Sequence, residues 1–485
     1  MTLHFTESGP ARPHGSVNIC EVKKDWGGDE TARSTSGWYQ VILGGSLDRD
    51  AVTDQFRRDE LLALSFLVMT ESSGCRESPL AMVASNLGQV VEPTPILAAP
   101  PRPSWSGMVA RASAAWQQLR STLAVYAGSR ALLLILAAVD SALTHRSLSS
   151  ELSNWDGYWY IKLASNGYPT HIPHVYSTLG FLPLYSMLMW LVTHVLFCSY
   201  LVAGLLISGI GGFVATVLVQ RLCTTWWGER NGRRAVLFFC AFPGSVVFSM
   251  VYSEGILIPL AAGCLIALER RRWMLAGILA GLATAVGPDA VAIVVACAVA
   301  SLLELRRRGW RDREAQRSLL APLLSPVGLC AFGAFLWVWD GTPLACFKAQ
   351  SYAWGERSDP LALYHQAQTL ASEISFTHFD YHAIDLNLVA GLLGAVVLVI
   401  GIVLMLRGAH RPPAAAIAWA LGIGFLAVTS EYTPPNPRLL ITAFPALLVI
   451  GCYLKDRGFK WLIAVSATLL VVMSAITYIG FALRP

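Results

Sequence analysis

Apolar runs long enough to cross a bilayer recur along most of the chain after residue 120, and they constrain its fold more than any other feature. A membrane-spanning α-helix needs about 20 such residues. The composition agrees, because 54% of the 485 residues are hydrophobic and only 14% are charged. Since a soluble domain usually carries about a quarter charged residues, we exclude a water-soluble enzyme, a disordered regulator and a disulfide scaffold. We expect an all-α, polytopic transmembrane helical bundle.

Arginine-rich loops between the apolar runs fix the predicted topology. They lie at 221–234, 270–272, 306–317, 407–411 and 455–460. Positively charged loops favour the cytoplasm, so the spans between them must come in pairs. The predicted spans, about eleven in number, are 122–143, 199–220, 235–251, 254–269, 273–287, 290–305, 319–338, 386–406, 413–430, 438–454 and 461–482. The N-terminus is then inside and the C-terminus outside. Arg130, early in the first span, is expected to snorkel to the cytoplasmic interface.

One apolar stretch, 179–198, does not fit this pairing. If it were a further span, the arginine-rich loop that follows the next helix would lie outside. We therefore expect residues 181–197 to form a helix that lies in the outer membrane interface. Pro183 near its start, and the polar residues Thr193 and His194 within it, are compatible with such a helix.

The first 110 residues differ from the rest, because they are polar and end in the Pro-rich stretch 93–103. Their apolar run, 61–69, is too short to span a bilayer, and no signal-peptide pattern follows Met1. We expect 1–110 to be a cytoplasmic, largely disordered extension, or the result of a start site placed too early, with Met108 as the later candidate. Residues 111–485 form the predicted transmembrane domain.

Charge and cysteine patterns exclude two classes of partner. The net charge of +5 comes from short basic clusters between apolar runs, which is not typical of nucleic-acid binding. The ten cysteines show no metal-ligand spacing. His378 and His382, with Asp380 between them, would share a helix face, but no third ligand is evident. We expect no metal centre, no cofactor and no nucleic-acid partner.

The predicted topology places most remaining polar residues on the outer face. The densest group is the first outer loop, 154–169, in which the carboxylate of Asp156 stands among aromatic residues. A partly desolvated carboxylate can accept a proton from an alcohol, and aromatic faces suit a sugar ring or a prenyl chain. The alternative is an aromatic belt at the headgroup level in which Asp156 is merely solvated. The candidate substrate-contacting residues of the outer loops and span ends are Trp155, Tyr158, Trp159, Tyr252, Ser253 and Trp354.

Two further groups lie at the outer ends of predicted spans. Glu254, which follows Tyr252 and Ser253, is costly in lipid and should face a cavity, where it would shape an acceptor site. The alternative is a polar hairpin turn. Arg438 opens a span and is suited to hold a lipid phosphate as it leaves, with Lys348 as a second candidate. For Arg438 the alternative is an anchor to headgroup phosphates.

These motifs together resemble the PIG-V-type mannosyltransferases, polytopic enzymes of the GT-C class. The family's Trp-Asp element, with its Ala-x-x-Gly-Tyr ending, is matched by Trp155, Asp156, Trp159, Tyr160, Ala164, Gly167 and Tyr168. Its Phe-x-Pro-Leu-Tyr-Pro element is matched by Phe181, Pro183, Leu184 and Tyr185, with Ser186 in place of the last proline. Its Phe-Pro-x-Ser…Tyr-Ser-Glu element is matched by Phe242, Pro243, Ser245, Phe248, Ser249, Tyr252, Ser253 and Glu254. The late Pro-Arg and Phe-Pro pairs are matched by Pro437, Arg438, Phe444 and Pro445. In one departure, Gly287 stands where relatives often carry the arginine of a Thr-Arg-Pro.

The resemblance implies a GT-C-like bundle that takes mannose from a polyprenyl-phosphate donor on the outer leaflet. The arginine bias and the Ala, Gly, Leu and Val content suggest a bacterial source. In a bacterium the acceptor would be an envelope lipid, glycan or protein, and the enzyme would lie in the plasma (inner) membrane. Asp156 would be the general base, Arg438 or Lys348 would steady the phosphate, and Glu254 would shape the acceptor site. A transporter or flippase of a lipid-linked sugar is the alternative, although such sites lie near the bilayer midplane. A third possibility is a non-catalytic scaffold, which would not need the carboxylates.

Overall fold

The computed structural model describes residues 105–373, 385–480 and 483–484. The predicted extension, apart from its last residues, and the pair His378 and His382 therefore lie outside the described residues. Within them the chain is helical, with one isolated β-bridge between Ser358 and Ser430. The helices are α2 Trp105–Thr144, α3 Leu148–Leu152, α4 Asp156–Asn166, η2 Thr178–Gly180, α5 Pro183–Leu196, α6 Tyr200–Ala241, η3 Pro243–Ser249, α7 Glu254–Glu269, α8 Trp273–Ala283, η4 Pro288–Ala290, α9 Val291–Arg308, α10 Arg313–Arg317, α11 Leu320–Leu324, α12 Val327–Asp340, α13 Ala345–Trp354, α14 Ala362–Glu373, α15 Leu386–Arg407, α16 Ala414–Thr429, α17 Pro437–Thr442, α18 Phe444–Tyr453 and α19 Asp456–Gly480. The predicted all-α class is confirmed.

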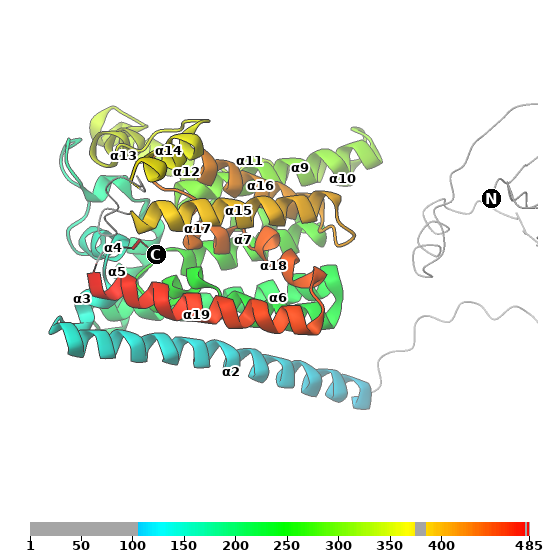
Figure 1. Cartoon of the computed structure of the whole chain (residues 1–485). Helices are drawn as coiled ribbons and strands as arrows, with labels where there is room; N and C mark the ends of the chain where they lie inside the picture. The colour runs from blue at the N-terminus through cyan, green and yellow to red at the C-terminus, as the bar shows by residue number, and fades with distance from the viewer. Residues whose placement is uncertain (1–104, 374–384, 481–482, 485) are drawn as a thin grey trace, which may run out of the picture. The chain divides into compact units, whose positions relative to one another are not determined.

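The described helices include several that can cross a membrane, and their long axes run side by side (Figure 1). Five are long and apolar enough by themselves, or up to seven if each of two bent pairs counts as one span. The predicted spans 273–287, 413–430 and 438–454 correspond instead to shorter apolar helices of 11, 16 and 10 residues. Length and composition thus support a polytopic membrane bundle but fewer spans than the eleven expected from the sequence.

Helix α6 contains a reversal of the chain inside the arginine-rich segment 221–234. Gly228 has a backbone conformation of φ 82 and ψ 167, which a residue with a side chain rarely adopts. The two halves run back along each other beside this glycine, because a Cβ on Gly232 would lie 2.0 Å from Thr224. The predicted helix 199–220 is therefore present, whereas the predicted span 235–251 is wrong as a single helix, because α6 ends at Ala241 and η3 follows at Pro243–Ser249.

The first half of α6 packs so closely on α7 that only glycine fits at the contact. A Cβ on Gly211 would lie 1.8 Å from the carbonyl oxygen of Gly255, and one on Gly255 would lie 2.6 Å from Cα of Ser208. Small residues allow such backbone approach between membrane helices. This contact fixes the first turn of α7, where Glu254 stands.

The segment before α7 is bent, and Arg130 holds it. The axes of η3 and α7 differ by 110°. The guanidinium of Arg130 donates to the carbonyl oxygen of Ser245, to Oγ of Ser245 at 2.9 Å and to Oγ of Ser249 at 3.2 Å. Arg130 is 8% exposed, so the prediction that it snorkels to the interface is wrong. The bend leaves buried oxygens in η3 that need donors, and the long side chain of Arg130 supplies them.

The stretch predicted as an interfacial helix forms α5. Pro183 occupies its first turn, where the missing N–H is tolerated. The helix buries Tyr185 and Met189 and exposes large apolar side chains such as Trp190 and Val195. A helix is thus confirmed at 181–197, while its position in the membrane interface stays a prediction.

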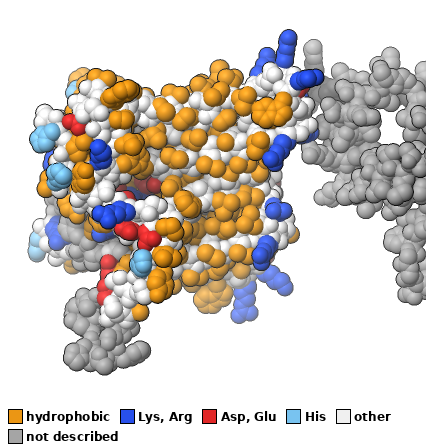
Figure 2. All heavy atoms as spheres, turned by 90° about the horizontal axis from the view of Figure 1, so that it is seen from above, with side chains coloured by type: hydrophobic (Ala, Val, Ile, Leu, Met, Phe, Trp, Pro, Cys, Tyr) orange, Lys and Arg blue, Asp and Glu red, His pale blue; other side chains and the backbone are white. Residues whose placement is uncertain are grey.

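The bundle has two chemically different ends, separated by a hydrophobic band (Figure 2). At one end the arginine-rich loops contact each other. Arg234 pairs with Asp456, Arg271 and Arg308 both pair with Glu304, and the indole of Trp227 donates to the carbonyl oxygen of His410. We call this the basic end. The opposite end carries α4, α13, α14 and the C-terminus of α19 (Figure 1).

Candidate functional site

Three helices begin at the end opposite the basic end, and each presents a charged residue in its first turn. Asp156 is the first residue of α4 and Glu254 the first of α7. Carboxylates are favoured there by the unpaired N–H groups of a helix N-terminus. Arg438 is the second residue of α17, which starts at Pro437 and is capped by the side chain of Asn436, an acceptor for the N–H of Leu439 at 3.0 Å.

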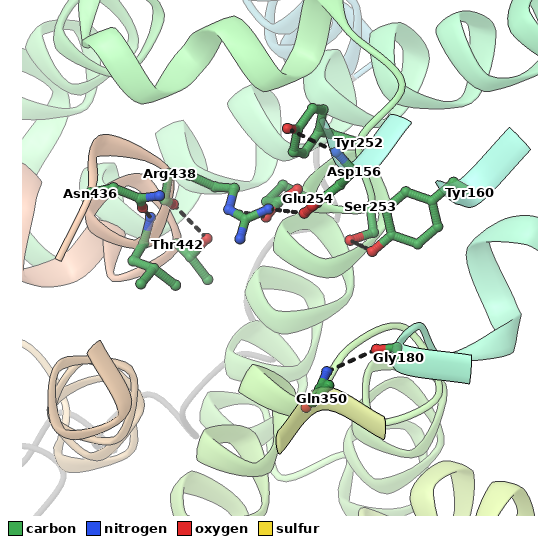
Figure 3. Close-up of polar contacts among 11 residues, drawn as sticks. Asp156, Tyr160, Gly180, Tyr252, Ser253, Glu254, Gln350, Asn436, Arg438 and Thr442 are labelled. Carbon is green, nitrogen blue, oxygen red and sulfur yellow. Dashed lines mark hydrogen bonds and ion pairs between the residues drawn. The ribbon is translucent and has the colours of Figure 1, made fainter. Parts of the chain in front are cut away.

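The three charged side chains converge, although Asp156 and Arg438 are 282 positions apart in the chain (Figure 3). Nη1 of Arg438 donates to Oδ2 of Asp156, and its Nε lies 3.4 Å from Oε1 of Glu254. The side chains of Asp156, Arg438 and Glu254 are 30%, 19% and 6% exposed. Asp156 is therefore the member of this group that a substrate reaches first.

Glu254 is the most buried of the three side chains, and one of its carboxylate oxygens lacks a hydrogen-bond partner among the described residues. Oε2 of Glu254 is buried and has no hydrogen-bond partner among the described residues. Asp289 of η4 also interacts electrostatically with both Asp156 and Arg438. Buried polar atoms normally have partners, so the free oxygen of Glu254 is available to a hydroxyl group of a ligand. We call Asp156, Glu254 and Arg438 the charged cluster.

Buried side chains next to the charged cluster hold its members in position. The backbone N–H of Asp156 lies 3.4 Å from the hydroxyl of Tyr252, whose ring lies 5.6 Å from the guanidinium carbon of Arg438. Tyr160 donates to Oγ of Ser253 at 2.8 Å. Burial raises the pKa of Tyr160 well above its usual value, so this hydroxyl keeps its proton. Since Tyr252 and Ser253 are 1% and 7% exposed, a positioning role suits them better than the substrate contact expected from the sequence.

Trp155, which precedes Asp156, has an unusual backbone conformation. Its φ of 59 is positive, which is rare and unfavourable for a bulky residue. Such strain persists only when the surrounding structure enforces it, and it is concentrated at functional sites. Here it directs the chain so that α4 starts with Asp156 facing Arg438.

An aromatic cluster lies beside the charged cluster and contains two of the predicted substrate-contacting residues. Trp159 and Trp354 meet edge to face with ring centroids 5.9 Å apart. Phe181 stacks on Trp159 at 6.4 Å and Tyr176 packs on Trp354 at 4.8 Å. A hydrogen bond of 2.8 Å from Gln350 to the carbonyl oxygen of Gly180 ties α13 to η2 (Figure 3). The structure thus brings Trp159 and Trp354 together.

The remaining predicted residues lie at the edge of these clusters or apart from them. Tyr158 is 54% exposed and packs on Trp159 at 5.1 Å. Lys348 is exposed on α13, and no contact of its side chain with the charged cluster occurs in the described part of the chain. Among the described residues, no group of three or more His, Cys, Asp and Glu side chains is arranged to hold a metal.

Two residues near the charged cluster were not anticipated from the sequence. Arg484 lies 4.2 Å from the Tyr432 ring and 5.9 Å from the Trp155 ring. Neither residue belongs to a recognisable motif. The sequence indicates their proximity only through the predicted topology, which places the end of the last span and the loop before Arg438 on the same outer face.

The described residues thus form a helical bundle of membrane-spanning candidates with a charged cluster and an aromatic cluster at one end. Residues 117–338 match the family model described as Mannosyltransferase (PIG-V). Over these residues the match agrees with the resemblance seen in the sequence motifs.

Solved structures of two other proteins are similar at low identity. ArnT from Cupriavidus metallidurans bound to undecaprenyl phosphate has a TM-score of 0.44 and 16% identity, covering 72% of this chain and 64% of that one. The oligosaccharyltransferase AglB from Archaeoglobus fulgidus, in complex with an inhibitory peptide and a dolichol-phosphate, has a TM-score of 0.39 and 13% identity, covering 76% and 57%. The chain therefore spans less than two thirds of either protein. No curated protein sequence matches the chain.

Proposed function

We propose that this protein is an inverting glycosyltransferase that moves mannose from a polyprenyl-phosphate donor to an acceptor of the cell envelope. The site would face the extracytoplasmic side of the plasma (inner) membrane, since it lies opposite the basic end and positive loops favour the cytoplasm. The acceptor is a hydroxyl of an envelope lipid, glycan or protein. The match of residues 117–338 to the PIG-V family model supports this proposal.

The observation that carries the proposal is the partly exposed carboxylate of Asp156 at the rim of the charged cluster. In the reaction, the acceptor oxygen forms a bond to C1 of the sugar while the bond from C1 to the phosphate oxygen breaks. The acceptor proton passes to the Asp156 carboxylate, and the polyprenyl phosphate leaves with the electron pair. General-base catalysis of this kind contributes about 10²–10⁴-fold.

Arg438 positions the Asp156 carboxylate, and Glu254 positions the acceptor. The guanidinium of Arg438 contacts Oδ2 of Asp156 and holds this carboxylate in place. Because a guanidinium is planar and donates in fixed directions, it also orients the carboxylate. The free Oε2 of Glu254 is suited to accept a hydrogen bond from a hydroxyl of the bound substrate. The aromatic cluster offers ring faces for the sugar.

A lipid-linked donor is consistent with an apolar cavity of about 370 Å³ beside the aromatic cluster. It lies between α12 and α13, and Leu182, the neighbour of Phe181, forms part of its wall together with Phe332, Trp337 and Phe347. An apolar, concave surface of this kind suits a prenyl chain. The chain of the donor would then stay in lipid while the sugar enters the site.

The test is the incubation of membranes containing the full-length protein with polyprenyl-phosphate mannose labelled in the sugar. Wild-type protein should transfer the label to an acceptor, and Asp156→Asn should lower the initial rate at least about 100-fold because the base is lost. Asp340→Asn is the matched control, since this exposed aspartate ends α12 outside the charged cluster. It should keep the wild-type rate.

The same assay separates the competing functions. Label that crosses the membrane unchanged on its lipid would indicate a transporter or flippase. Transfer that is equal in wild type and Asp156→Asn would contradict the role of Asp156, and no transfer by wild-type protein with any envelope fraction would contradict the enzyme assignment.

A further inference from the structure

The charged cluster holds more negative than positive charge. Arg438 lies between the carboxylates of Asp156 and Glu254, and Asp289 interacts with the same guanidinium. Nη1 of Arg438 is therefore engaged with Asp156 before any ligand arrives, and its Nε lies 3.4 Å from Oε1 of Glu254 without a hydrogen bond. A phosphate brought to this site would meet like charges, which repel it. A donor that carries a phosphate needs a second cation close by.

Arg484 is a cation beside the Trp155 ring whose charge is not taken up by a carboxylate. No ion pair between Arg484 and an acidic side chain occurs among the described residues. Its Nη1 donates to the carbonyl oxygen of Tyr432 at 3.3 Å, and its backbone N–H donates to Oδ1 of Asn387 at 2.8 Å. The remaining guanidinium N–H groups are free for an anion.

Two aromatic rings and a buried neighbour fix the position of Arg484. The guanidinium carbon lies 4.2 Å from the centroid of Tyr432 and 5.9 Å from that of Trp155. Leu483, the preceding residue, is 4% exposed. Packing against ring faces holds an arginine while leaving its edge N–H groups able to donate. The side chain is therefore placed in advance rather than free in solvent.

The position of Arg484 suits the phosphate of the proposed donor. Trp155 is the neighbour of Asp156, and Arg484 lines a small cavity together with Pro437, the neighbour of Arg438. Tyr432 in turn interacts electrostatically with Asp156 and with Tyr176 of the aromatic cluster. Arg484 thus lies beside the ring of the residue that precedes Asp156.

We propose that Arg484 binds the phosphate of the lipid-linked donor, between the rings of Trp155 and Tyr432. Its N–H groups donate to the phosphate oxygens and stabilise the charge that the phosphate gains when its bond to C1 of the sugar breaks. The acceptor proton goes to Asp156. This inference rests on the proposed function and deepens it, because it assigns the phosphate to Arg484 rather than to Arg438 or Lys348.

The test is the binding of undecaprenyl phosphate to the purified full-length protein in a nonionic, phosphate-free detergent, followed by tryptophan fluorescence. Arg484→Gln should weaken this binding about tenfold or more, since a charge-assisted hydrogen bond contributes about 1.5–3 kcal/mol. Arg484→Lys should restore part of it. Binding of undecaprenol, which lacks the phosphate, should be equal in all variants. Arg357→Gln, an exposed arginine at the same end of the bundle, is the matched control and should bind undecaprenyl phosphate as wild type does.

Each other outcome has a definite meaning. Equal binding of undecaprenyl phosphate by wild type and Arg484→Gln would overturn the inference and leave the proposed function standing. A second contrary result would be equal binding of undecaprenyl phosphate in detergent, together with a loss of thermal stability of Arg484→Gln that occurs only in phosphatidylcholine vesicles. This result would assign Arg484 to a bilayer headgroup and would also overturn the inference. Failure of wild-type protein to bind undecaprenyl phosphate would contradict the proposed donor itself, and the inference with it. A fall in inorganic phosphate binding, without a fall for undecaprenyl phosphate, would likewise overturn it.

Discussion

The two ends of the bundle carry the same types of charged group in opposite proportions. At the basic end one carboxylate, Asp456, lies between two arginines, Arg230 and Arg234. At the other end one arginine, Arg438, lies between two carboxylates, Asp156 and Glu254. In the first group Asp456 and Arg230 are 72% and 65% exposed and Arg234 is 11% exposed, whereas in the second Arg438 and Glu254 are 19% and 6% exposed.

The difference in burial separates a surface contact from a candidate active site. Exposed ion pairs are screened by water and contribute about 0–1 kcal/mol. Buried charges are expensive to desolvate and persist where they are paired or have a function. The basic end needs only the positive charge that orients the chain in the membrane. The charged cluster combines burial, excess negative charge and an unsatisfied carboxylate oxygen, which are features of a site that receives a ligand.

The largest effect on stability is expected when the charged cluster loses its cation. Arg438→Ala leaves Glu254 buried without a partner and should lower the free energy of unfolding by about 3–5 kcal/mol. Arg230→Ala, the corresponding change at the basic end, should lower it by about 0–1 kcal/mol. Thermal unfolding in detergent measures both, and Arg438→Lys should recover part of the loss. Similar losses for the two alanine variants would remove the distinction between the ends.

A smaller effect, on substrate use, is expected in the aromatic cluster. Trp354→Ala removes a ring that contacts Trp159, Tyr176 and Phe181. An aromatic contact contributes about 0.5–1.5 kcal/mol, so kcat/KM for the lipid-linked sugar should fall about tenfold. Trp461→Ala, which changes a 66% exposed tryptophan of α19, is the control. If both variants lowered kcat/KM equally, the aromatic cluster would have no special role in binding the sugar.

The smallest effect concerns the pH dependence of stability. Burial raises the pKa of Glu356, with a smaller opposing effect from its hydrogen bond to Ser430. The folded protein then binds this proton more tightly than the unfolded chain. Stability is lost as pH rises from the unfolded pKa, about 4.3, through the folded one. Glu356→Gln removes this loss and should raise the melting temperature relative to wild type increasingly toward neutral pH.

The control for this comparison is Glu229→Gln, which changes an exposed acid in the arginine-rich segment. Its melting temperature should follow wild type at every pH. A Glu356→Gln variant whose difference from wild type does not change between pH 4 and pH 8 would show that the titration of Glu356 is not linked to folding.

The sequence predicted the charged cluster well, because topology alone brings its members to one end. Glu254 and Arg438 each stand at the outer boundary of a predicted span, Asp156 lies in the first outer loop, and positive loops define the opposite side. The motif match added the expectation that Asp156 is catalytic. Neither argument gives contacts, so the pairing of Arg438 with both acids could be seen only in three dimensions.

Other features depend on packing that local patterns do not encode. Arg130 was expected at an interface because an arginine in an apolar run usually snorkels, but the bent η3 supplies buried acceptors for it. The short helices α8 and α18 appear within longer apolar runs, and hydropathy does not locate such breaks. Arg484 approaches Trp155 from the far end of the chain, and no periodicity or motif predicts that contact.

We propose that Asp156 carries the chemistry because it belongs to the charged cluster, and not simply because it is an acid paired with arginine. Initial rates of labelled sugar transfer for Asp156→Asn and Asp456→Asn, measured side by side in the same membranes, distinguish these possibilities. We expect a loss of about 100-fold or more for Asp156→Asn and a change within about twofold for Asp456→Asn. Equal rates for the two variants would rule out this role of Asp156.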